Sequence, residues 1–179
     1  EAALMAFNIP PNVFRKDFCF KNWKNYQADL FTLIFEKSLE KEESFNARIV
    51  GFDNDRRVLN KALQNVRGAL MQDQIELYEA DITDFDQQEK LPPKGTLVFN
   101  PPYDVKLEAD VDDLYYKIGN SLKDNFKGYQ AWAFSASLDG LKKIHLKADK
   151  KYRLMNAKLE SHLVGYTIFS GAAADEEKG

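Results

Sequence analysis

The sequence predicts a doubly wound α/β fold with a mostly parallel sheet, and three observations support this prediction. Short apolar runs typical of strands alternate along the chain with amphipathic segments typical of helices. Polar residues directly follow three of these runs, at the edge where parallel sheets bind ligands. Two apolar runs near the carboxyl end are separated only by a short turn, which predicts an antiparallel hairpin at the edge of the sheet.

The predicted elements follow one another in a regular order. They lie at residues 1–8 (helix), 23–41 (helix), 48–52 (strand), 55–70 (helix), 75–80 (strand), 96–99 (strand), 111–125 (helix), 129–134 (strand), 137–144 (helix), 151–155 (strand) and 159–169 (strand). Alternation of this kind predicts right-handed β-α-β steps and hence a parallel sheet that carries the final hairpin.

Each assignment depends on a local pattern. Strong helix formers open the chain, and Pro10-Pro11 stop that first helix. The next two helical segments place their apolar residues about 3.6 positions apart, and Asp55 can cap the second of them. The strands are short apolar runs, and Asn156-Ala157 is the expected turn of the hairpin.

Composition predicts one soluble domain. The chain has 179 residues, of which 44% are apolar and 30% are charged. We therefore expect a single domain over residues 1–170 and a flexible tail over 171–179. Cys19 is the sole cysteine, which excludes an internal disulfide framework and a cluster of zinc-binding thiolates. Because no apolar run approaches the roughly 20 residues of a membrane span and no signal peptide is present, we expect a cytoplasmic protein without a membrane partner.

The net charge of the chain argues against strong binding of nucleic acid by this chain alone. The formal net charge is -3, whereas such proteins carry a strongly basic surface. A lysine-rich stretch between residues 142 and 153 is interpreted as a solvated face.

Three polar residues stand directly after predicted strands and are candidates for ligand binding. Asp53, Asp81 and Asn100 are separated by 28 and 19 residues, so they are expected along one edge of the sheet. A carboxylate in the place of Asp53 can accept both hydroxyls of a ribose, and we assign helix capping to Asp55 instead. Asp81 can accept from the exocyclic amino group of a purine, although an aspartate at a strand end is also a common turn former.

The stretch Asn100-Pro101-Pro102-Tyr103 ends a buried strand in a stiff turn. One interpretation is a rigid turn and nothing more. However, the stretch resembles the motif of S-adenosylmethionine-dependent methyltransferases that modify planar amino or amide nitrogens. In such a motif the Asn100 oxygen and the Pro101 carbonyl accept the protons of the target nitrogen, while Tyr103 stacks on the target base. Positioning would then contribute most of the catalysis.

Four stretches extend the resemblance to nearly the whole chain. EAALMAFNIPPNVFRKDFCFKNW, GFDNDRRVLNKALQNVRGA, YEADITDF and FNPPYDVKL are similar, in this order, to the methyltransferase domain of THUMP-containing bacterial 23S ribosomal RNA guanine-N2 methyltransferases. Members of this family are often labelled N6-adenine-specific DNA methylases. The resemblance implies the Rossmann-like fold of class I methyltransferases.

The resemblance also implies S-adenosylmethionine as the cofactor and assigns its binding residues. The residues are Asp53 with Asn54 at the ribose, Asp81 with Ile82 near the adenine, and Asn100 to Tyr103 around the target base, with Asn100 also next to the cofactor. No metal is implied. His145 and His162 receive structural or surface roles, because the methylated nitrogen can lose its proton late without a general base.

Two departures from the family pattern qualify these assignments. Asp104 stands where relatives commonly have glycine. In addition, the chain starts just after the place of the family's first strand and its glycine-rich loop, so we expect a sheet that lacks this strand between those ending at Phe52 and Phe99. A gap there would leave backbone groups unpaired. We expect an upstream segment with a THUMP domain in the full protein, and weak cofactor binding and no activity for this chain alone.

The predicted function is methylation of an exocyclic amino group of a nucleic-acid base, with guanine N2 of 23S ribosomal RNA preferred because of the resemblance. The target base would be rotated out of its stack to reach the site. The motif itself leaves three alternatives open: an adenine-N6 DNA methyltransferase, a glutamine-N5 protein methyltransferase and a non-catalytic RNA-binding fragment.

Overall fold

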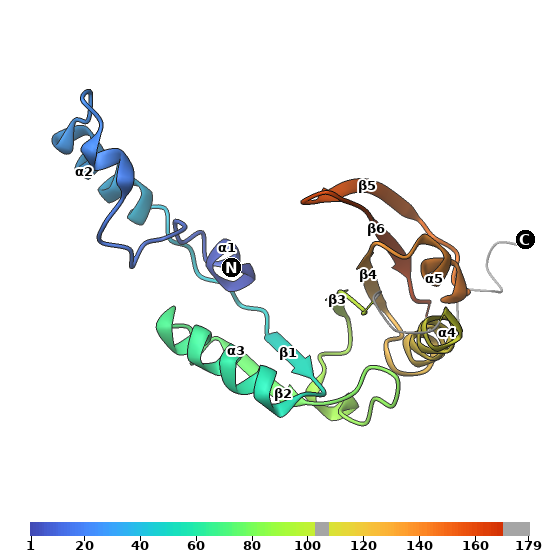
Figure 1. Ribbon diagram of the computed structural model, residues 1–179. Helices are drawn as coiled ribbons and strands as arrows, with labels where there is room; N and C mark the ends of the chain where they lie inside the picture. Colours follow the sequence, from blue (N-terminus) through green and yellow to red (C-terminus); the bar gives the residue numbers. More distant parts are fainter. Residues whose placement is uncertain (103–107, 170–179) are drawn as a thin grey trace, which may run out of the picture. The chain divides into compact units, whose positions relative to one another are not determined.

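The structure is a computed structural model that describes residues 1–102 and 108–169 (Figure 1). The chain divides into two compact units, Glu1–Glu79 and Ala80–Gly179, which we call the amino-terminal and carboxy-terminal units. The tail predicted over residues 171–179 lies outside the described residues.

The amino-terminal unit is a small β-α-β arrangement preceded by helices. Its elements are α1 (Ala2–Ala6), the 3-10 helix η1 (Cys19–Asn22), α2 (Ala28–Leu39), β1 (Ile49–Asp53), α3 (Arg56–Gly68) and β2 (Ile75–Glu79). β1 and β2 run parallel, with Asp53 opposite Glu79 at their carboxyl ends. α3 packs against both strands, as Figure 1 shows. The strand and helix pattern of the sequence is thus confirmed for this unit.

Two features of this unit differ from the prediction. α2 begins at Ala28 rather than at residue 23, because the preceding residues fold into η1 and bends, and Gln27 is extended with φ -115°. Cys19, on η1, is exposed. The apolar residues whose spacing predicts the helix all lie within α2, whereas Trp23 and Tyr26 lie in the segment before it.

The carboxy-terminal unit contains a four-stranded mixed sheet. Its elements are η2 (Gln88–Lys90), β3 (Gly95–Phe99), α4 (Glu108–Asn125), β4 (Tyr129–Ser135), α5 (Leu138–Lys143), β5 (Lys150–Asn156) and β6 (Leu159–Thr167). The strand order is β3-β4-β6-β5, in which β3 and β4 are parallel and the β5–β6 hairpin joins β4 in antiparallel fashion. The predicted hairpin is confirmed. Its turn residues are Ala157 and Lys158, one position later than predicted, and Ala157 has φ 54°.

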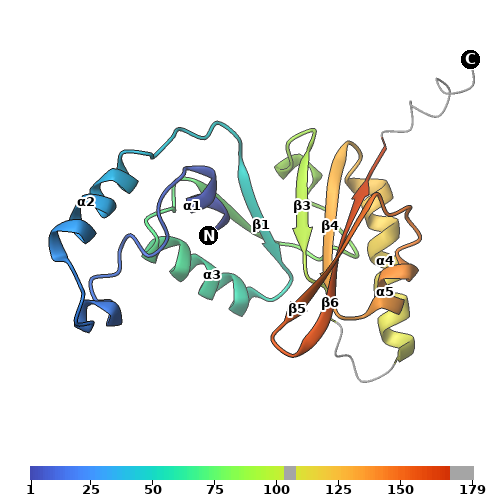
Figure 2. The ribbon, with the colours of Figure 1, turned by 90° about the horizontal axis from the view of Figure 1, so that it is seen from above.

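Helices α4 and α5 cover one face of this sheet (Figure 2). β4 alternates buried and more exposed residues, as a strand with one covered face must. The covering face of α4 buries Tyr115, Ile118 and Leu122, which are three and four positions apart. Gly119 lies where a Cβ atom would be 2.1 Å from the carbonyl oxygen of Ile144, so the glycine permits close packing of α4 on α5.

Each sheet, taken by itself, has edge strands. β1 is an edge strand of the two-stranded sheet, and β3 is an edge strand of the four-stranded sheet, within the described residues. These are the two strands that the prediction places on either side of the absent one. An α/β arrangement with two parallel pairs and one antiparallel hairpin agrees with the predicted fold class.

Candidate active site

The end of β1 is held in a tight hydrogen-bonded turn that leads into α3. The backbone N–H of Asp55 donates to Oδ1 of Asp53 over 2.8 Å, and the Asp53 side chain is part-buried. Oδ2 of Asp53 has no hydrogen-bond partner within the described part of the chain. One carboxylate oxygen thus fixes the turn, and the other is available to accept from a ligand hydroxyl. Asn54, next to it, is exposed.

Asp55 has the capping role that the sequence predicts. Its Oδ1 accepts from the backbone N–H of Arg57 over 2.8 Å, at the first turn of α3. The Arg57 guanidinium also donates to both carboxylate oxygens. The side-chain hydrogen bond from Arg57 and then its backbone N–H lower the pKa of Asp55 below the usual range. Because Asp55 is occupied in this way, Asp53 is the carboxylate of this turn that remains for binding.

The turn after β2 is formed by the side chain of Asp81. Its Oδ1 accepts from the backbone N–H of Thr83 over 2.8 Å and from the Thr83 hydroxyl over 2.7 Å. Asp81 therefore acts as a turn former, which is one of its two predicted roles. Ile82 is half-buried beside it. Contact of Asp81 and Ile82 with an adenine remains a prediction.

β3 is followed by an exposed asparagine and a buried proline. β3 pairs with β4 in parallel up to Phe99, which lies opposite Ala133. Asn100 follows and is exposed, Pro101 is buried, and Pro102 is exposed. Among the described residues, the Asn100 side chain makes no hydrogen bond. The turn thus combines an exposed asparagine with a buried proline directly after it.

The predicted site residues therefore occupy three successive turns, each held by its own local contacts. Asp53 and Asn54 lie in the amino-terminal unit, while Asp81, Ile82 and Asn100 to Pro102 lie in the carboxy-terminal unit. Tyr103, the predicted stacking residue, lies outside the described residues. The structure places the described residues at strand ends, as the sequence predicts.

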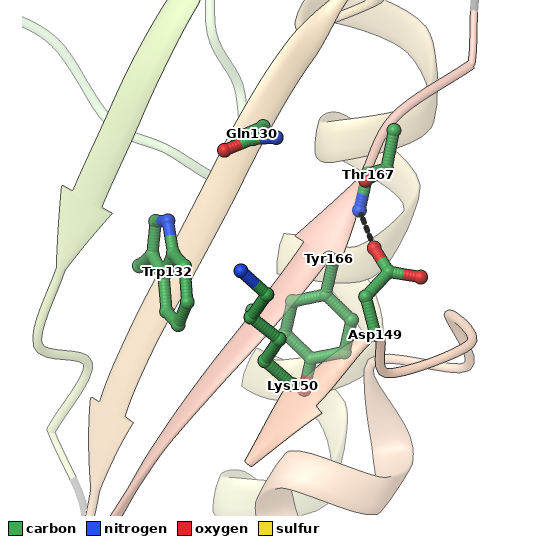
Figure 3. A pocket seen from close by; sticks show the side chains of 7 residues that line it. Gln130, Trp132, Asp149, Lys150, Tyr166 and Thr167 are labelled. Carbon is green, nitrogen blue, oxygen red and sulfur yellow. Dashed lines mark hydrogen bonds between the residues drawn. The ribbon is translucent and has the colours of Figure 1, made fainter. Parts of the chain in front are cut away.

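A small cavity lies elsewhere, on the face of the β4-β6-β5 sheet (Figure 3). Its volume is about 60 Å³, and its lining includes Trp132, Lys150 and Tyr166. The Thr167 N–H donates to Oδ2 of Asp149 over 2.6 Å at its rim. None of the predicted site residues lines this cavity, and it brings no nucleophile next to a base. Its residues do not form a second candidate active site.

The two histidines agree with structural or surface roles. His162 lies on β6 with 9% of its surface exposed, and His145 is exposed. Nδ1 of His162 is buried without a hydrogen-bond partner. Across residues 1–102 and 108–169, no three His, Cys, Asp or Glu side chains group closely enough to hold a metal ion. Over the same residues, no helix has the length and apolarity to span a membrane.

Sequence reasoning missed one conspicuous group of side chains. Six aromatic residues between positions 18 and 35 of the amino-terminal unit contact one another around η1 and the start of α2. The available signal was the mixture of basic and aromatic residues in RKDFCFKNWKNY, which the sequence analysis assigned partly to a loop and partly to a helix.

A family model matches most of the chain. Residues 1–164 match the model described as the RMKL-like methyltransferase domain. The match includes all of the described turns that carry the predicted site residues.

Curated relatives bear related descriptions. A protein of Vibrio parahaemolyticus named ribosomal RNA large subunit methyltransferase K/L is 35% identical over 185 residues, and the match covers 100% of this chain and 26% of that protein. A protein of the same name from Aliivibrio fischeri is 32% identical over 182 residues, with 98% of this chain and 26% of that protein covered. The chain thus spans about a quarter of the length of these relatives.

Solved structures share the fold. The crystal structure of SMU.472 complexed with SAH has a TM-score of 0.81 and 29% identity, covering 93% of this chain and 44% of that one. The structure of a possible methylase from Clostridium difficile has a TM-score of 0.80 and 24% identity, with the same coverage. These similarities confirm the predicted Rossmann-like methyltransferase fold.

Proposed function

Because this chain belongs to the family of RMKL-like methyltransferase domains, we propose that its complete protein methylates an exocyclic amino group of a base in large-subunit ribosomal RNA. The proposed target is guanine N2, and the proposed methyl donor is S-adenosylmethionine. The relatives named as ribosomal RNA large subunit methyltransferases support the RNA substrate, and a related fold complexed with SAH supports the donor. A ribosomal RNA substrate implies a cytoplasmic site of action.

The exposed amide of Asn100 is the observation that carries this proposal. It follows β3 directly, precedes buried Pro101 and has no hydrogen-bond partner among the described residues. An exocyclic amino nitrogen has its lone pair delocalised into the ring, so it is a weak nucleophile. Acceptors that hold its protons fix its orientation toward a methyl group. The Asn100 oxygen and the Pro101 carbonyl are proposed as these acceptors.

The residues present fit the proposed donor. Asp53 is part-buried at the end of β1 and keeps Oδ2 available, which suits a ribose hydroxyl. We assign Asp53 and Asn54 to the ribose and Asp81 and Ile82 to the adenine. When bound, the donor supplies an electrophilic methyl carbon on sulfur. The target nitrogen gains the methyl group and releases one proton to water, so the chain needs to orient the nitrogen but not to remove a proton first.

Methyl transfer to three substrate classes tests the proposal. The complete protein is incubated with labelled S-adenosylmethionine and, in parallel, with ribosomal RNA lacking the modification, DNA and a peptide release factor. We expect label in the ribosomal RNA, recovered as N2-methylguanosine after digestion to nucleosides. Label recovered as N6-methyladenine in DNA, or as methylglutamine in the release factor, contradicts the proposal in favour of the corresponding alternative. No label in any substrate would indicate a non-catalytic role.

A further inference from the structure

The amino-terminal unit displays a group of aromatic side chains that the proposed chemistry does not use. We call it the aromatic cluster, and it consists of Phe18, Phe20, Trp23, Tyr26, Phe31 and Phe35. Phe20 and Phe31 lie at its centre, with ring centroids 5.4 Å apart. Phe18 stacks on Phe20 at 5.1 Å, and Trp23 meets Phe20 edge-on at 6.3 Å. The rings hold one another in place.

One ring of this cluster, that of Trp23, is exposed to solvent, and the other five residues are half-buried. None of the residues of η1 or α2 is buried, and 67% of Trp23 is exposed. Tryptophan is enriched at interaction sites, and here its ring is mostly exposed beside half-buried aromatic residues. Packing within the cluster therefore explains how the rings are fixed but not why Trp23 faces solvent.

Cations surround the rings. The Arg15 guanidinium lies 5.1 Å from the ring centre of Phe18, and Lys21 Nζ lies 5.9 Å from Phe18 and 5.5 Å from Phe31. Residues 15–24 carry four cations and one acid, a net charge of +3, although the whole chain has a net charge of -3. The local charge is thus opposite in sign to that of the chain. A polyanion that also carries flat aromatic groups complements both properties.

We propose that the aromatic cluster and its cations bind a single-stranded segment of RNA. A base stacks on the exposed ring of Trp23, which the half-buried rings support, and Arg15 and Lys21 contact phosphates. Proteins that bind single strands combine these two elements, because every base has a face that stacks and every nucleotide carries a charge. This inference rests on the proposed RNA substrate and adds to it a docking surface distinct from the Asn100 turn.

Fluorescence of Trp23 tests the proposal directly. The chain has two tryptophans, so a Trp132→Phe background leaves Trp23 as the sole reporter. A short oligouridylate is titrated in without S-adenosylmethionine. We expect quenching of Trp23 emission that saturates with the same dissociation constant as the anisotropy of a fluorescein-labelled oligouridylate. Binding without quenching would overturn the stacking arrangement, and absence of binding would overturn the whole proposal.

Matched variants separate stacking from loss of structure. We expect Trp23→Leu to weaken oligouridylate binding about tenfold, in line with the stacking of one base, and Trp23→Tyr to retain most of the affinity. Phe169→Leu replaces another aromatic residue that is 69% exposed but lies outside the cluster, and it should leave affinity unchanged. Equal losses in Trp23→Leu and Phe169→Leu would contradict the proposal.

The salt dependence of binding tests the cations. Each phosphate contact to a single strand contributes about 0.7 to the slope of log affinity against log salt. Lys21→Ala should lower that slope by about this amount, whereas Lys61→Ala, an exposed lysine on α3, should not change it. An unchanged slope in Lys21→Ala contradicts the assignment of phosphate to this residue.

Two controls keep this proposal separate from others. Asn60→Ala, which removes an exposed amide from α3, should bind oligouridylate as tightly as the parent chain. Because this binding is measured without a methyl donor, its result does not depend on whether the complete protein transfers a methyl group. Vesicles containing anionic lipid serve as the alternative polyanion. If the emission of Trp23 is quenched or shifted to the blue by vesicles but does not change with oligouridylate, the RNA proposal is wrong and the cluster binds a membrane surface instead.

Discussion

The two units of the chain bury very different amounts of apolar surface. In the carboxy-terminal unit, α4, β4, α5 and β6 enclose a continuous core that includes Tyr115, Leu122 and Ile144. The buried residues of the amino-terminal unit, in contrast, are Ala3, Leu4 and Met71, and no residue of α2 or α3 is buried. Hydrophobic burial is the main favourable contribution to folding, so the carboxy-terminal unit is expected to be much the more stable.

This difference corresponds to a difference in assigned roles. The Asn100 turn, which must hold a nitrogen in a fixed orientation, is attached to the well-packed unit. Asp53 and the aromatic cluster, which are proposed to contact ligands, belong to the sparsely packed unit.

Truncating one leucine in each unit should give the largest contrast. Leu122 is fully buried on α4, and Leu122→Ala should lower the free energy of unfolding by about 2–5 kcal/mol, because it leaves a cavity. Leu33 on α2 is 53% exposed, and Leu33→Ala should cost less than about 1 kcal/mol. Urea unfolding followed by circular dichroism measures both. Similar losses at the two positions would show that the units do not differ as described.

Two glycines offer a second contrast of opposite sign. A Cβ atom at Gly119 would meet the backbone of Ile144, so Gly119→Ala should destabilise the carboxy-terminal unit by about 1–3 kcal/mol. A Cβ atom at Gly68, in the last turn of α3, meets nothing within 4 Å. Gly68→Ala should therefore stabilise α3 by up to about 1 kcal/mol through its helix propensity. The prediction fails if the thermal midpoints of both variants move in the same direction.

The ionisation of buried Tyr166 should make the stability of the carboxy-terminal unit depend on alkaline pH, which is a smaller effect than those of the substitutions above. Burial raises the pKa of Tyr166 to about 12, from an ordinary value of 10.0, with the nearby Tyr115 as a second cause. The folded state therefore keeps this proton while the unfolded state releases it. The resulting stability is fully present below about pH 10 and is lost as pH rises toward about 12.

Phenolate absorbance during an alkaline titration measures this ionisation. The pKa of Tyr78 is also raised, first by its hydrogen bond to Glu76, so Tyr166 is not expected to be the only tyrosine that ionises late. Tyr166→Phe should reduce the late component of the titration by one phenolate, and an undiminished late component would contradict the assignment.

Most of the fold could be predicted because local patterns and tertiary packing agree in most elements. Asp55 is an example: an aspartate is a preferred residue type at a helix start, and its side chain accepts from the backbone N–H of Arg57 in the first turn of α3. The start of α2 was predicted too early, because the apolar residues with helical spacing begin only at Ala28, whereas Trp23 lies in the turn after η1. The spacing marks the body of a helix and does not mark its first residue.

The site could be predicted to a different extent. The sequence predicts the site at the strand ends, because polar residues directly follow apolar runs. The structure places Asp53, Asp81 and Asn100 at or just after the ends of β1, β2 and β3. Of the two roles predicted for Asp81, the hydrogen bonds with Thr83 show the turn-forming one, and the contact with an adenine stays a prediction. The aromatic cluster was missed because its residues come from a 3-10 turn and a helix, and neither element alone marks a surface.

The most direct test of the central claim is the rate of methyl transfer to ribosomal RNA in a single turnover by the complete protein carrying Asn100→Ala. We expect a loss of about 100-fold or more, with an unchanged thermal midpoint, because the amide is exposed and acts by positioning the target nitrogen. Asn60→Ala, which removes an exposed amide from α3, serves as the matched control and should retain the parent rate. A rate for Asn100→Ala equal to that of Asn60→Ala would contradict the account.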